Sequence, residues 1–335
     1  MTDETQPQSR RWSRIALRAV GLGLIIGALA FVTNGGQLLA LGSSQFWIAY
    51  FLAASAALVS LLSNGATIKI LNGAPVRYRE ALSAGALVVA LFPLLPSRLS
   101  EGLKPLYLSS ASGQPFSHGL AALIGERFLD LIVVGCLALC SLALVAVADQ
   151  SLLLVAVATF WLVTCVGGAG LIVVTKNVDR ISALVQRLPV AFLRKLILLF
   201  CEGLQQKLKI ASLLSALPFV VVTWMFSVLK IYLFVNIAGS IELSLSQILV
   251  VFVIATAGLA VAVTPGGIGT FEASFAALLA LYGYDLDEGL FLAITFRLAI
   301  LFPSVCLVAY LVLSGQLDLT RLLAKLRLRR SDAST

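Results

Sequence analysis

Long runs of apolar residues, separated by short polar stretches, extend along the whole chain. Runs of about 20 residues can cross a bilayer as helices, and such runs lie near residues 15–33, 46–68, 119–148, 151–175, 212–238 and 289–314. Two further apolar stretches, 80–118 and 247–283, are interrupted by proline, glycine and charged residues. The pattern predicts an all-α integral membrane protein with about six full transmembrane helices and two broken or re-entrant hairpins.

The composition supports one polytopic membrane domain over residues 1–335. The chain is 60% hydrophobic and 12% charged, with a mean hydropathy of +1.01, whereas ordinary soluble domains carry about 25% charged residues. Its five cysteines include no CxxC pair, and it has one histidine. We therefore expect no metal, no cofactor and no disulfide scaffold.

The net charge of +8 comes from bases that cluster beside the ends of apolar runs. The clusters lie at 10–18, 69–79, 176–209 and 321–330. Such clusters mark the cytoplasmic side of a membrane and contact anionic lipid headgroups, so we expect membrane lipids, and not nucleic acid, as partners. Segment 176–209 is either a set of interfacial helices broken at Pro189 or a solvated linker, and 316–335 is a basic cytoplasmic tail.

The positions of these charges also predict the path of the chain. With both termini in the cytoplasm of a bacterial inner membrane, stretch 80–118 must start and end inside. No base lies between Lys230 and Arg297, and the five acids there place the neighbouring turns outside, so stretch 247–283 must start and end outside. Two broken segments of opposite orientation are typical of inverted-repeat transporters, whose substrate binds between the breaks.

Charged residues within the apolar runs are the candidates for function. Each costs roughly 2.5 to 3.5 kcal/mol on insertion, so those present usually pair or line a pathway. Three groups qualify: Arg98, Glu101 and Lys104 in PSRLSEGLK; Glu126, Arg127 and Asp130 in ERFLD; and Glu272, with Arg297 as a possible partner. The first group could instead be a solvated loop, and the second a structural ion-pair network with Arg98 or Lys104.

The sequence TPGGIGTFE adds a second kind of candidate. Gly266 and Gly267 allow the backbone to approach a ligand closely, and a half-helix starting near Thr270 would present free amides to a phosphate. If Gly269 caps that half-helix, Glu272 is at its third position and can satisfy the free amides itself. Pro265 ends the preceding helix.

Together these motifs resemble the lysylphosphatidylglycerol synthase transmembrane-region family of flippase-like membrane proteins. The family form is LP-x-R-x-GE-x-x-R, then ERxxD, then PGGxGxxE, then an arginine in the final helix. The matching positions here, which the resemblance marks as substrate-binding, are Pro96, Arg98, Glu101, Lys104, Glu126, Arg127, Asp130, Pro265, Gly266, Gly267, Gly269, Glu272 and Arg297. Ser100 replaces the motif glycine and Lys104 replaces an arginine, which removes a bidentate phosphate contact.

The resemblance implies a lipid flippase or transporter that moves a phospholipid or polyprenyl-type lipid between leaflets. It implies no synthase activity, because the soluble aminoacyl-transfer domain of the full synthases is absent from this sequence. Two alternatives remain open. One is an integral membrane transferase that acts on a lipid donor, with Glu126 and Asp130 as its acids, and the other is a non-transporting partner of lipid-synthesis enzymes.

Overall fold

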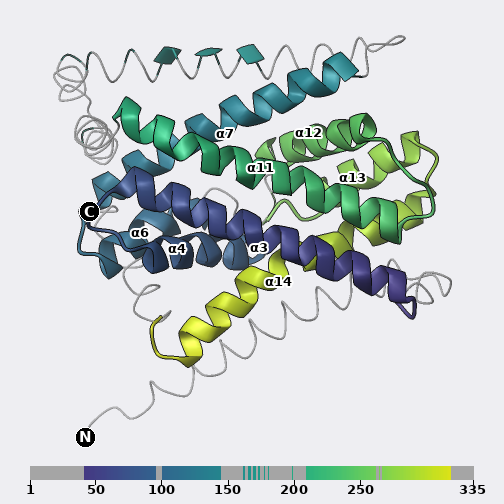
Figure 1. Ribbon diagram of the computed structural model, residues 1–335, viewed down its shortest axis with the longest axis horizontal. Coiled ribbons are helices and arrows are strands. Elements are labelled where there is room, and N and C mark those ends of the chain that lie inside the picture. The colour runs from purple at the N-terminus through teal and green to yellow at the C-terminus, as the bar shows by residue number, and fades with distance from the viewer. Residues whose placement is uncertain are drawn as a thin grey trace, which may run out of the picture.

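The computed structural model describes residues 41–95, 100–144, 209–261, 264 and 266–317, together with isolated positions between 161 and 198. Over these residues the chain forms helices and no strand, which confirms the predicted all-α class (Figure 1). The helices are α3 (Ser44–Asn72), α4 (Tyr78–Leu91), a 3-10 turn (Phe92–Leu94), α6 (Leu103–Ala111), α7 (Phe116–Leu144), α11 (Ile210–Ala238), α12 (Leu245–Val261), α13 (Thr270–Leu281) and α14 (Leu286–Leu313).

Three described helices, α3, α11 and α14, are long and apolar enough to cross a membrane, with 29, 29 and 28 residues. At 1.5 Å per residue each extends over about 42 Å, more than the roughly 30 Å of a hydrocarbon core. They match the predicted runs 46–68, 212–238 and 289–314. Run 119–148 forms most of α7, whose middle carries the ERFLD charges. Run 15–33 and most of 151–175, 176–209 and 316–335 lie outside the described residues.

Helices α3 and α11 are antiparallel neighbours and lie side by side (Figure 1). Ser60 donates to the Thr223 carbonyl at 3.2 Å, and Ser63 to the Phe219 carbonyl at 2.7 Å, so residue numbers rise along one helix as they fall along the other. The face of α3 that is buried is rich in alanine, which lets the two backbones approach closely. Hydroxyl-to-carbonyl bonds then add polar contacts within an apolar interface.

The turns at the two ends of this helix pair differ in charge. Lys69 lies in the last turn of α3, Arg77 follows this helix, and Lys209 precedes α11, so these bases share one end. The N-terminus of α14 lies at the other end, where Phe291 packs against Phe46 with their ring centroids 5.8 Å apart. This second end carries the acids Glu242, Asp285, Asp287 and Glu288. We call the two the basic end and the acidic end.

The α4–α6 segment starts and finishes at the basic end. Helix α4 begins after Arg77, and α6 leads to Gln114, whose amide donates to the Asn72 side chain at 2.8 Å beside the C-terminus of α3. The helical path is interrupted after Leu91 by the 3-10 turn that contains Pro93. In Figure 1, α4 and α6 lie toward one end of the α3–α11 pair.

The α12–α13 segment starts and finishes at the acidic end. Asn236, near the end of α11, bonds both the N–H and the carbonyl of Leu243 just before α12, at 2.8 and 2.9 Å. Tyr284, just after α13, donates its hydroxyl to the Ile241 carbonyl. Both ends of the segment are therefore tied to the turn that follows α11. Figure 1 shows α12 and α13 toward the end opposite α4 and α6.

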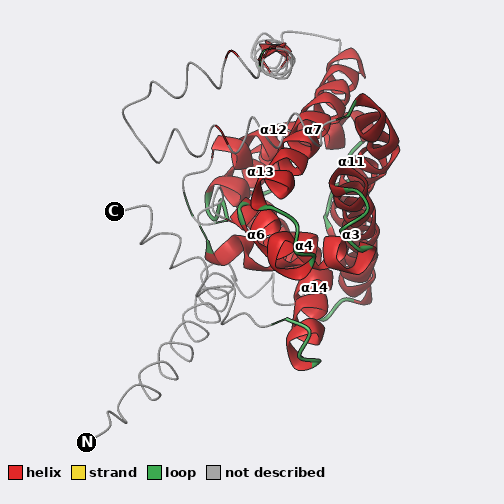
Figure 2. Ribbon diagram, turned by 90° about the vertical axis from the view of Figure 1, so that its left-hand side faces the viewer, coloured by secondary structure: helices red, strands yellow, loops and turns green. Residues whose placement is uncertain are grey.

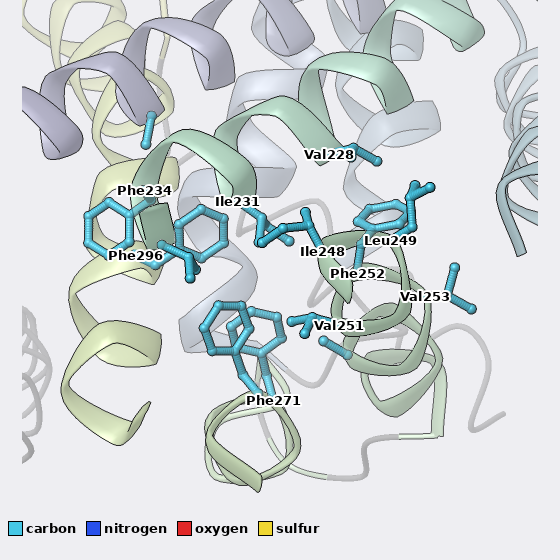
Figure 3. Close-up of a cluster of buried hydrophobic side chains, with 14 of the residues drawn as sticks. Val228, Ile231, Phe234, Ile248, Leu249, Val251, Phe252, Val253, Phe271 and Phe296 are labelled. Atoms are coloured by element: carbon cyan, nitrogen blue, oxygen red, sulfur yellow. The ribbon is translucent and has the colours of Figure 1, made fainter. Parts of the chain in front are cut away.

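An aromatic cluster packs α13 against α11 and α14 (Figure 3). Phe296 of α14 lies 5.5 Å from Phe234 and is stacked on Phe275, with centroids 5.8 Å apart. The view in Figure 2 shows the α3–α11 pair on one side of the molecule and α4, α6 and α13 on the other. The core thus fixes the broken segments against the long helices.

Candidate functional site

Arg127 of α7 is the centre of an ion-pair network. Its guanidinium lies 3.1 Å from Asp130 Oδ2, 3.2 Å from Glu126 Oε1 and 3.5 Å from Glu101 Oε2. Glu101 lies just before α6, whereas Glu126, Arg127 and Asp130 occupy just over one turn of α7. Packing of α6 against α7 is close, because a methyl on Gly119 would lie 2.8 Å from the Pro105 Cα. This close approach brings the two charged motifs together.

Glu126 is the most deeply buried member, with 2% of its side chain exposed. One oxygen, Oε1, accepts three hydrogen bonds from described residues: from Lys104 Nζ at 2.5 Å, Asn64 Nδ2 at 2.8 Å and Arg127 Nη2 at 3.2 Å. Two cations and an amide replace the water that this carboxylate loses on burial, as a buried charge requires. The structure thus contains the ion pair between Lys104 and an ERFLD acid that was one interpretation of the sequence.

Asp130 is held by a residue that the sequence did not indicate. Trp224 of α11 donates its indole N–H to Asp130 Oδ1 at 2.8 Å, while Arg127 contacts Oδ2. The two carboxylate oxygens thus have separate partners on different helices. Asn64 and Trp224 connect the network to α3 and α11 and fix its position within the bundle.

The network has an inner and an outer part. The side chains of Lys104, Glu126 and Asp130 are 7%, 2% and 14% exposed. Those of Arg127 and Glu101 are 42% and 30% exposed, and the 3.5 Å between these two side chains is the longest ion-pair distance in the network. Arg127 and Glu101 are the members that an approaching polar group could reach.

The TPGGIG turn forms a second polar centre. Gly266, Gly267 and Gly269 adopt φ values of 61°, 65° and 87°, a region that side chains rarely adopt. Helix α13 begins at Thr270, as predicted, and Glu272 accepts a hydrogen bond from the Gly269 N–H at 2.8 Å. The carboxylate caps the half-helix from its third position, so it occupies one of the free amides.

Arg297 of α14 fixes this turn through several contacts. Its Nε lies 2.5 Å from Glu272 Oε1, and its Nη1 donates to the Gly266 carbonyl at 2.6 Å. Its Nη2 reaches the Gly267 carbonyl at 3.5 Å, and the guanidinium carbon lies 4.8 Å from the Phe271 ring centroid, within cation–π range. The predicted pairing of Glu272 with Arg297 is present, and the guanidinium is largely committed to the turn.

Helix α4 connects the two polar centres. A methyl on Gly85 would lie 3.0 Å from the Asn64 side-chain oxygen, next to the ion-pair network. A methyl on Gly266 would lie 2.7 Å from the Pro93 Cα and 3.1 Å from the Phe92 carbonyl oxygen. Eight residues separate Gly85 from Pro93, about 12 Å along a helix. The turn of one broken segment therefore touches the break in the other.

Of the predicted residues, the structure brings Glu101, Lys104, Glu126, Arg127 and Asp130 together at one centre. It brings Gly266, Gly267, Gly269, Glu272 and Arg297 together at the other. Arg98 and Pro265, like Pro96, lie outside the described residues. Within the described ranges, no three His, Cys, Asp or Glu side chains form a group that could hold a metal ion. Sequence reasoning did not name Asn64, Trp224 or Pro93 as site residues. Asn64, a polar residue within a long apolar run, and Pro93, a proline in the interrupted stretch 80–118, gave a signal, whereas Trp224 gave none.

Comparison with known proteins agrees with the motifs. A family model described as "Lysylphosphatidylglycerol synthase TM region" matches residues 18–307. A curated relative, a "UPF0104 membrane protein" from Methanothermobacter thermautotrophicus, is 27% identical over 227 residues. The aligned region covers 63% of this chain and 66% of the relative, slightly less than two thirds of its length. No solved structure matches the chain.

Proposed function

Because the chain belongs to the lysylphosphatidylglycerol synthase transmembrane-region family, we propose that this multi-pass membrane protein moves a polar-headed lipid between leaflets. The substrate class is a phospholipid or polyprenyl-type lipid with a charged headgroup. The membrane is the bacterial inner membrane, with both termini in the cytoplasm and the acidic end outside.

The observation that carries the proposal is the ion-pair network around Arg127. Five charged side chains meet between helices that are otherwise apolar, and two of them, Arg127 and Glu101, remain 42% and 30% exposed. A purely structural network would gain from replacement by apolar side chains, because buried ion pairs seldom add stability. Half-exposed charges at membrane depth instead suit a path for a polar group.

The orientation of the broken segments supports the same function. One segment is tied to the basic end and the other to the acidic end, and their breaks meet at Pro93 and Gly266. Bases mark the cytoplasmic side of membrane proteins, so the α4–α6 segment enters from inside and the α12–α13 segment from outside. A headgroup that passes between these two breaks would cross the membrane along non-helical backbone and charged side chains.

The predicted residues divide into two roles in this proposal. Arg127 and Glu101 contact the headgroup, with Arg127 as the phosphate ligand, because guanidinium geometry suits phosphate oxygens. Lys104, Glu126 and Asp130 are positioning residues that hold Arg127. Glu272 and Arg297 are positioning residues for the TPGGIG turn, because each already bonds the backbone of that turn.

Reconstitution of the purified chain into liposomes tests the proposal. Fluorescent phospholipid analogues are placed in both leaflets, and an impermeant quencher reports which fraction stays protected inside. We expect the protein to expose the protected fraction, and lipid extraction to recover the analogue unchanged.

Other outcomes point to other functions. A new lipid species in the extract, formed from added donor, would support a membrane transferase. Transport by this chain would be refuted if the protected fluorescence stayed at the protein-free level. This result would have to hold for both phospholipid and polyprenyl-phosphate analogues, with and without a pH gradient.

A further inference from the structure

The contact between Gly266 and Pro93 is unusually close. A Cβ atom at Gly266 would lie 2.7 Å from the Pro93 Cα, 3.1 Å from the Phe92 carbonyl oxygen and 3.2 Å from the Pro93 nitrogen. All three are backbone atoms, which cannot rotate away as a side chain can. The tips of the two broken segments thus meet backbone to backbone, with no room for a methyl group.

We propose that Pro93 and Gly266 form the constriction of the lipid route, closed in this structure, and that the two tips must separate for a headgroup to pass. This inference rests on the proposed function. It adds Pro93, which no sequence motif marked, and it gives Gly266 a role different from contact with a ligand. The residue at 266 is glycine because the closed state leaves no space for a side chain.

The TPGGIG turn is held by contacts that do not involve the opposite tip. The TPGGIG turn is held by Arg297 and Glu272, and bonds from Gly267 N–H to the Thr264 carbonyl and from Thr264 Oγ1 to the Ile268 carbonyl close it internally. Among the described residues, no hydrogen bond joins 92–94 to this turn. Between the described residues of the two tips the contacts are van der Waals contacts, so parting them breaks no hydrogen bond among those residues.

Spin labels beside the contact can report its opening. Leu94 and Ile268 are 50% and 45% exposed and lie one and two residues from the contact. Their Cα atoms are at most about 16 Å apart, given 3.8 Å between consecutive Cα atoms. The native cysteines are replaced, and new cysteines at these two positions are labelled with nitroxides. In lipid nanodiscs, the electron paramagnetic resonance spectrum of the closed protein should then show dipolar broadening.

Gly266→Ala and Gly269→Ala are a matched pair of test variants. Both positions have positive φ, so alanine strains the backbone at each. Only Gly266 faces the other tip, because a Cβ at Gly269 would have no atom within 4 Å. We expect Gly266→Ala to reduce the broadening strongly and Gly269→Ala to retain it. Equal broadening in both, with equal melting temperatures, would overturn the constriction.

A chemical link between the tips tests their role without the Gly266→Ala substitution. A short cleavable thiol reagent that joins cysteines at 94 and 268 should stop lipid exchange, and cleavage of the linker should restore it. Exchange that continues while the tips are linked would overturn the constriction but not the proposed transport. Another outcome is that exchange stays absent after the linker is cleaved, although Gly266→Ala reduces the dipolar broadening. That result would overturn the transport function and, with it, the role of this contact as a constriction.

Discussion

Glu272 and Arg297 form an ion pair that joins α14 to the N-terminus of α13. The Arg297 Nε lies 2.5 Å from one oxygen of Glu272, and the other oxygen accepts a hydrogen bond from the Gly269 N–H at 2.8 Å. The sequence left capping and pairing as two interpretations of Glu272. The structure combines them, since each carboxylate oxygen serves one purpose.

Replacing Glu272 with glutamine should destabilise the protein strongly. The variant keeps the shape of the side chain and can still cap α13. However, Arg297, whose side chain is only 12% exposed, loses its carboxylate partner. Breaking a buried pair from one side costs about 3 kcal/mol, far more than loss of an exposed carboxylate. Denaturation in detergent, compared with Glu242→Gln at an exposed acid, measures the difference. A loss of no more than about 1 kcal/mol would mean that capping is the main role.

Two of the acids that contact Arg127, Glu126 and Glu101, should differ in their effect on stability. Glu126→Gln removes a buried charge opposite Lys104 and Arg127, and we expect a loss of about 3 kcal/mol. Glu101→Gln removes a partly exposed partner 3.5 Å away, and we expect about 0.5 kcal/mol. Thermal melting of both variants in the same detergent checks the order. Equal losses would contradict the division into an inner and an outer part.

The Trp224 indole should matter through its hydrogen bond. Trp224→Phe keeps the aromatic packing and leaves Asp130 Oδ1 without its donor, at a cost of about 2 kcal/mol. Trp47 provides the control, because its indole bonds the Leu41 carbonyl from a side chain that is 45% exposed. Water can replace that bond, so Trp47→Phe should cost no more than about 0.5 kcal/mol. Similar losses in the two variants would remove Trp224 from the network's support.

The charge difference between the two ends predicts the orientation of the chain. Cysteine at Asp287, on the acidic end, should react with an impermeant thiol reagent added to intact cells. Cysteine at Arg77, on the basic end, should react only after the cells are opened. Both positions are exposed, so access to the reagent is not limited by burial. Labelling of both from the same side would refute opposite entry of the two broken segments.

The sequence predicted the ion pairs because charges in apolar runs need partners. This rule suggested Arg98 or Lys104 as partners of the ERFLD acids and Arg297 as a partner of Glu272, and the structure pairs Lys104 with Glu126 and Arg297 with Glu272. The partners of Asn64 and Trp224 were missed because a neutral hydrogen-bond donor carries no charge that selects its partner, and only the packing of α3 and α11 against α7 shows which carboxylates they bond.

The glycines of the TPGGIG turn show a different limit. Their type predicted positive φ and close backbone approach, and the structure has both. What approaches Gly266 is Pro93, from a segment more than 170 residues earlier in the chain. No local pattern contains such a contact, because it depends on how two separate segments pack. The beginning of α13 at Thr270 was predictable, since capping is decided within four residues.

Lipid exchange by Arg127→Gln tests the central claim most directly. In liposomes that contain an analogue moved by the unaltered protein, we compare this variant with Glu242→Gln, using only preparations with matching melting curves. We predict exchange at the protein-free level for Arg127→Gln, because the proposed phosphate ligand is lost, and full exchange for Glu242→Gln. Full exchange by a folded Arg127→Gln protein would contradict a headgroup path through this network.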